Sequence, residues 1–88
     1  MNKKMIVKIE ECLENLRDKP IKISQTGFLI NQFFIDKLMY KIQNDILNLR
    51  DEVKEVYLSV NLNQVFKIEI SENKIILFLD NDLEIQIG

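Results

Sequence analysis

The side chains that most often perform acid–base, nucleophilic or metal chemistry are scarce in this chain. Histidine, the usual general base near neutral pH, is absent. The single cysteine, Cys12, cannot by itself supply a structural zinc site. The two glycines cannot form a Walker loop, a G-x-G-x-x-G turn or a nucleophile elbow. A Ser–Lys or two-carboxylate enzyme stays open, but no spacing nominates one. The sequence therefore predicts a protein that is not an enzyme and binds no cofactor or metal.

Two features invite a chemical interpretation and have simpler ones. The run Asp80-Asn81-Asp82-Leu83-Glu84 resembles the opening of a calcium loop, but Ile85 stands where an EF-hand needs glycine. A hairpin turn is favoured, since Asp and Asn form turns readily. Cys12 lies in an apolar helical stripe, which favours a buried small side chain over a reactive thiol.

Length and composition predict a single domain over residues 1–88 with a well-filled core. Ile, Leu and Val number 30 of the 88 residues, and five Phe add large apolar area. A lone cysteine fits a reducing compartment. The longest unbroken apolar run, Ile75–Leu79, is far shorter than a membrane span. We expect a cytoplasmic protein with no membrane partner, in the host cytoplasm if a phage encodes it.

Charge is divided unevenly along the chain. Residues 1–44 carry eight basic and five acidic side chains (+3), whereas residues 45–88 carry four and nine (−5), which gives the net −2. This split suits charge-steered docking. Five of the eight basic residues of the first part lie near its start: Lys3, Lys4, Lys8, Lys19 and Lys22. They form either a phosphate-binding end or a solvated face, because glutamates are interspersed among them.

Periodicity predicts two helices followed by four strands. The first helix covers about residues 2–18, on the stripe Met5, Ile6, Ile9, Cys12, Leu13 and Leu16, and ends before Pro20. A short strand at 21–24 and an extended segment at 28–30 follow, unless the next helix already begins at Thr26. The second helix covers about 31–52, capped by Asn31, with a core stripe of Ile35, Leu38, Met39, Ile42, Ile46, Leu49 and Val53. Alternation then predicts strands at 56–62, 66–70, 75–79 and 83–87.

These elements predict an α+β, two-layer domain. Two helices pack on one face of a four-stranded antiparallel meander, with an extra short N-terminal strand or hairpin over residues 21–30 as an open addition.

Two apolar groupings are not needed for that core. Phe33, Tyr40 and Leu47 are spaced by seven, opposite the core stripe of the second helix. They are either interior or a ridge for self-association, which would give a homodimer. The second grouping is Ile76 and Phe78, which we expect on the polar face of the sheet beside Tyr57, Lys67, Glu69, Glu84 and Gln86. Shielding by long neighbouring side chains and an interface patch both explain it.

The sequence thus predicts a small non-catalytic domain that binds a protein partner stoichiometrically. We expect binding through Tyr57, Lys67, Glu69, Ile76 and Phe78, together with the acidic last hairpin of Asp80, Asp82 and Glu84. By analogy of size, composition and charge, the specific hypothesis is a bacterial or phage-encoded inhibitor, such as an anti-CRISPR-like protein, or an immunity protein. The alternatives are a nucleic-acid-binding accessory protein that uses the basic N-terminal half, or a structural homo-oligomer.

Overall fold

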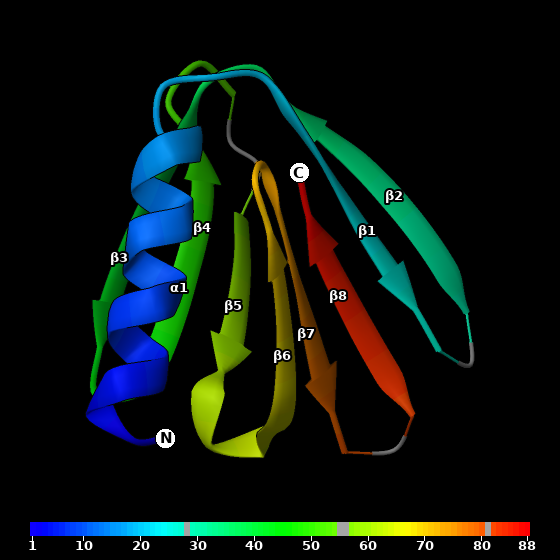
Figure 1. Ribbon diagram of the computed structural model, residues 1–88. Coiled ribbons are helices and arrows are strands. Elements are labelled where there is room, and N and C mark those ends of the chain that lie inside the picture. The colour runs from blue at the N-terminus through cyan, green and yellow to red at the C-terminus, as the bar shows by residue number, and fades with distance from the viewer. Residues whose placement is uncertain (28, 55–56, 81) are drawn as a thin grey trace.

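The chain folds into one helix and eight strands in a computed structural model that describes residues 1–27, 29–54, 57–80 and 82–88, with only the backbone of Tyr57. The elements are α1 (Lys3–Leu16), β1 (Ile21–Thr26), β2 (Ile30–Ile35), β3 (Leu38–Gln43), β4 (Ile46–Asp51), β5 (Tyr57–Asn61), the 3-10 turn η1 (Leu62–Gln64), β6 (Val65–Ser71), β7 (Lys74–Leu79) and β8 (Leu83–Ile87). A five-stranded antiparallel sheet has the order β2-β1-β8-β7-β6, and a three-stranded sheet has the order β3-β4-β5 (Figure 1).

The prediction of two helices on a four-stranded meander is wrong. The segment expected as the second helix, residues 31–52, instead forms most of β2 and all of β3 and β4. The meander is also shorter than expected, since β5 belongs to the three-stranded sheet and only β6, β7 and β8 follow one another in the larger sheet. The expected strand at 21–24 and segment at 28–30 fall in a true hairpin, β1–β2. Phe28, Val56 and Asn81 lie outside the described residues.

The β3–β4 hairpin depends on a two-residue turn at Asn44 and Asp45. Both have positive φ (54° and 61°), as a type I′ turn requires, and Asn and Asp tolerate this conformation better than other non-glycine residues. The turn places Tyr40 opposite Leu49 and Ile42 opposite Leu47, with all four side chains toward the core. The apolar spacing of residues 31–52 fits a helix as well as strands, and the turn between β3 and β4 favours strands.

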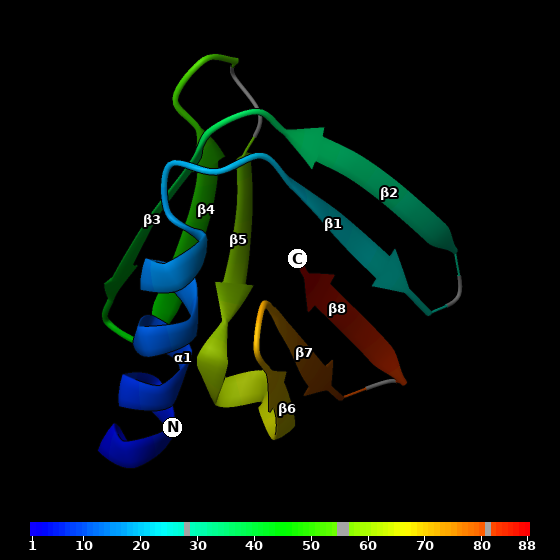
Figure 2. The ribbon, with the colours of Figure 1, turned by 45° about the horizontal axis from the view of Figure 1, so that its top comes forward.

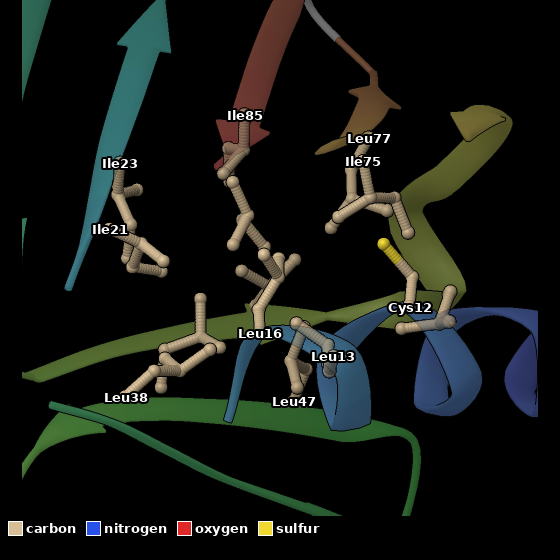
Figure 3. Packing of buried hydrophobic residues seen from close by; sticks show 14 of the residues in the cluster. Cys12, Leu13, Leu16, Ile21, Ile23, Leu38, Leu47, Ile75, Leu77 and Ile85 are labelled. Atoms are coloured by element: carbon tan, nitrogen blue, oxygen red, sulfur yellow. The ribbon is translucent and has the colours of Figure 1, made fainter. Parts of the chain in front are cut away.

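Helix α1 packs against the inward-facing side chains of both sheets and covers the core. Asn2 caps the helix by accepting a hydrogen bond from the Met5 N–H at 2.9 Å. Its buried side chains are Ile9, Cys12, Leu13 and Leu16, as the apolar stripe predicted. Figure 3 shows three of them against Leu38 and Leu47 of one sheet and Ile75, Leu77 and Ile85 of the other. The two sheets and the helix therefore share one core. Among the described residues, no helix is long and apolar enough to cross a membrane.

The chain passes from the larger sheet to the smaller one at a corner held by Asp51. Asp51 is 6% exposed, and its carboxylate accepts hydrogen bonds from the backbone N–H groups of Asp36 (2.8 Å), Lys37 (3.2 Å) and Val53 (2.9 Å). Burial acts to raise the pKa of this carboxyl, but the backbone hydrogen bonds outweigh burial and lower the pKa below its ordinary value of 3.8. Two ion pairs flank the corner, Lys37–Glu52 at 3.2 Å and Lys54–Asp36 at 2.9 Å. Asp51 thus satisfies backbone groups that neither sheet pairs.

Replacing Leu47 with alanine tests whether this side chain is buried, as the structure places it, or exposed on a ridge. Leu47 is fully buried, so Leu47→Ala should destabilise the fold by about 2–5 kcal/mol. Phe34→Ala is the control, because Phe34 is 64% exposed and its truncation should change stability by less than about 0.5 kcal/mol. Urea denaturation measures both. Equal, small effects would contradict the placement of Leu47.

Asp51→Asn should lower the free energy of unfolding at neutral pH, because an amide cannot replace both carboxylate oxygens as acceptors. A carboxyl whose pKa is lower in the folded chain stabilises the fold above its unfolded pKa, and this contribution is lost as pH falls through the folded pKa. The difference between wild type and variant should therefore shrink below pH 3.8. Urea denaturation at several pH values checks this. Asp36→Asn, at the same corner but exposed, should have little effect, and a similar loss there would contradict the special role of Asp51.

Candidate protein-binding surface

One face of the five-stranded sheet is left uncovered by the rest of the chain. Strand alternation sends Ile75, Leu77, Ile85 and Ile87 into the core and their neighbours outward. Register brings the outward residues into two rows across the sheet. The first row is Ile30, Thr26, Glu84, Phe78 and Lys67. The second row is Gln32, Ser24, Gln86, Ile76 and Glu69. Phe34 near the end of β2 and Lys22 near the start of β1 lie opposite each other beside the second row. We call the two rows and these two residues the outer face.

Near its β6 edge, the outer face combines an aromatic ring with a charged pair. The Lys67 ammonium lies 5.1 Å from the centroid of the Phe78 ring, within the range of a cation–π contact. The same ammonium pairs with Glu69 at 3.2 Å, and both side chains are more than half exposed. Phe78 and Ile76 are half-buried. Lys67 and Glu69 therefore shield the apolar side chains only in part.

Five of the predicted binding residues meet on this face: Lys67, Glu69, Ile76, Phe78 and Glu84. The three other residues do not join them. Asp80 and Asp82 are exposed at the β7–β8 turn, where Asp82 has a φ of 58°. Tyr57 begins β5 in the other sheet, opposite Arg50, and its side chain lies outside the described part of the chain. The acidic hairpin thus borders the outer face, whereas Tyr57 belongs to another part of the molecule.

Sequence reasoning missed two strongly exposed apolar side chains of the outer face, Ile30 (73% exposed) and Phe34 (64% exposed) on β2. The sequence instead predicts an extended segment at Ile30 and a helix at Phe34. The available signal was the absence of charge in residues 23–35, which is unusual for a segment that ends in solvent. The outer face is therefore more apolar at its β2 end than the sequence suggested.

The expected ridge of Phe33, Tyr40 and Leu47 does not form, because the helix that would align them is absent. The three residues lie on β2, β3 and β4, and Leu47 is fully buried. Phe33 and Tyr40 are half-buried against the core. The Tyr40 hydroxyl donates a 2.6 Å hydrogen bond to the Glu14 carboxylate, which ties α1 to β3. This contact explains Tyr40 as a structural residue.

The remaining chemical candidates are separated or inert. Burial raises the pKa of the Cys12 thiol above its ordinary value of 9.0, which disfavours the reactive thiolate. Lys3, Lys4 and Lys8 lie in the first turns of α1, whereas Lys19 precedes β1 and Lys22 lies within it. The nucleic-acid alternative stays a prediction. Within the described ranges, no three His, Cys, Asp or Glu side chains are grouped to hold a metal ion.

Comparison of the chain with protein-family models, with curated proteins and with solved structures finds no match. Function must therefore be inferred from the geometry of the chain itself.

The Tyr40–Glu14 contact predicts a distinctive titration. Burial, the hydrogen bond to Glu14 and the charges of Glu14 and Glu10 raise the pKa of Tyr40 to about 12 from an ordinary 10.0. Because the raised pKa favours neutral tyrosine in the folded chain, its contribution to stability is complete below pH 10.0 and is lost as pH rises toward 12.

Tyrosinate absorbance should show one group titrating near pH 12 that disappears in Tyr40→Phe. Glu14→Gln should lower the pKa of Tyr40, because it removes the charged acceptor, whereas Glu11→Gln should leave the pKa unchanged. A Tyr40 that titrates at its ordinary value in the folded wild type would mean that the hydrogen bond does not form.

Proposed function

We propose that this chain is a non-catalytic protein-binding domain that covers part of a partner's surface with its outer face. The observation that carries the proposal is that four apolar side chains point outward on one sheet, Ile30 and Phe34 on β2 and Ile76 and Phe78 on β7, with the polar residues of β1 and β8 between the two pairs. Aromatic and aliphatic anchors within a polar rim are the composition of protein interfaces.

The charged side chains near the apolar ones indicate which charges a partner surface should carry. Lys67 and Glu69 lie beside Phe78 and Ile76, and Glu84 lies opposite Phe78 on β8. Asp80 and Asp82 add negative charge at the adjoining turn. A partner surface with two apolar patches and basic side chains between them, facing Glu84 on the central strand β8, would complement this arrangement. The narrower hypothesis of a phage-encoded inhibitor or an immunity protein stays a prediction, because it names a partner that the outer face alone does not identify.

Capture from a bacterial lysate with and without Phe78→Asp tests the proposal. The immobilised chain should retain a specific protein, which is then purified and titrated against the chain by calorimetry. We expect one-to-one binding, weakened at least about tenfold by Phe78→Asp, since loss of a central interface aromatic typically costs more than 1.4 kcal/mol. Phe78→Thr, which keeps a strand-forming residue, guards against a folding defect in the aspartate variant.

Gln43→Asp is the matched control, because it adds the same charge at an exposed position of β3 in the other sheet. It should leave the affinity unchanged. The proposal fails if folded Phe78→Asp and Phe78→Thr bind like wild type, or if no protein is retained.

A further inference from the structure

Strand β2 is an open sheet edge without the features that normally protect one. It pairs with β1 on one side only, and Figures 1 and 2 show no element beyond it. Its six residues, Ile-Asn-Gln-Phe-Phe-Ile, carry no charge, and the hairpin that contains it is uncharged over the 13 residues 23–35. Exposed edges usually carry charged side chains, proline or a bulge, which prevent pairing with another strand.

The other edges differ from β2 in this respect. Strand β6, at the opposite end of the same sheet, carries Lys67 and Glu69 and has a register shift between Val65 and Lys67. Strand β3 carries Lys41 and is tied to α1 by Tyr40. The chain leaves β5 through η1 into β6, which Figures 1 and 2 place next to it. Among the strands of the described ranges, the unprotected edge is thus confined to β2.

We propose that β2 pairs antiparallel with β2 of a second copy of this chain. The two five-stranded sheets then form one sheet of ten strands with a two-fold axis through the new contact. An uncharged strand meets its own copy without like-charge repulsion. It also offers no charged group that would select the strand of a different protein, which favours a second copy as the occupant.

The side chains of β2 define the register of this pairing. Residues directly opposite each other in an antiparallel pair point to the same face of the sheet. Outward residues of one copy must therefore face outward residues of the other, which requires a two-fold axis that passes between the two copies of a single residue. An axis at Gln32 places Ile30 opposite Phe34 of the second copy, and Phe34 opposite its Ile30. These are the two most exposed apolar side chains of the strand (73% and 64%), and aromatic–β-branched pairs stabilise a sheet. An axis at Phe33 would instead set Ile30 against Asp36, a carboxylate.

The axis at Gln32 also makes this residue its own partner across the dimer. Two amides can hydrogen-bond to each other there, because each has both donors and acceptors. The contact is only one strand wide, so we expect a dimer that dissociates on dilution. It would also join the two outer faces on one side of the continuous sheet.

Sedimentation of the purified chain from about 1 μM to about 1 mM tests the inference. Wild type should pass from monomer to dimer. Gln32→Lys and Gln32→Glu should each weaken the dimer roughly fivefold or more, since like charges then oppose each other. An equimolar mixture of the two variants should recover it as a mixed dimer. Recovery requires that residue 32 of one copy meets residue 32 of the other.

Gln43→Lys, a matched substitution at an exposed position of the β3 edge, should dimerise like wild type. A wild type that stays monomeric over the whole range overturns the inference and leaves β2 to a strand of another protein. A dimer unaffected by Gln32→Lys, or a mixture without mixed dimers, also overturns it. Because only the pure chain is measured, this outcome is separate from the partner-binding test.

Discussion

The buried carboxylate of Asp51 is the constraint on which the two-sheet arrangement depends. At the end of β2 the chain leaves the larger sheet, and the N–H groups of Asp36 and Lys37 have no strand partner there. Asp51 supplies acceptors from the end of β4, and Asp18 and Lys19 complete the corner through backbone hydrogen bonds to Leu38. The end of α1, the start of β3 and the end of β4 therefore meet at one point. That point fixes one end of the smaller sheet against the helix.

The parts of the fold that depend on local chemistry could be predicted from the sequence. Asn2, the apolar stripe and Pro20 define α1, and short polar turns separate β6, β7 and β8. Residues 31–52 could not be assigned, because a spacing of three or four satisfies a helix while alternate residues satisfy strands. The deciding feature is the pair of successive left-handed residues at Asn44 and Asp45. The sequence signal for this turn is weak because neither residue is glycine. In the sequence, Asp51 cannot be distinguished from an ordinary polar residue, because its role depends on backbone groups that only the fold brings together.

The residues of the candidate surface also differ in how far the sequence alone predicts them. Alternation was enough to group Ile76 and Phe78 with Lys67, Glu69 and Glu84, because these residues lie on consecutive strands. Ile30 and Phe34 belong to the same face only because β1 pairs with β8, a contact between residues about 60 positions apart. Likewise, the turn η1 sends β5 and β6 into different sheets, which removed Tyr57 from the face. Local periodicity predicts which way a side chain points, but not which strands become neighbours.

The two edge strands of the larger sheet, β6 and β2, differ in charge. A strand that is solvated on its outward side, such as β6, alternates apolar with charged residues, whereas β2 places Ile30 and Phe34 outward with no charge between them. Such a strand exposes apolar area to water at a cost in free energy, and pairing with a second copy would reduce that exposed area. Pairing would leave Phe78 of each copy uncovered and facing the same way. A partner that presents two equivalent sites could then bind both copies, and the second contact would be favoured by the proximity that the first creates.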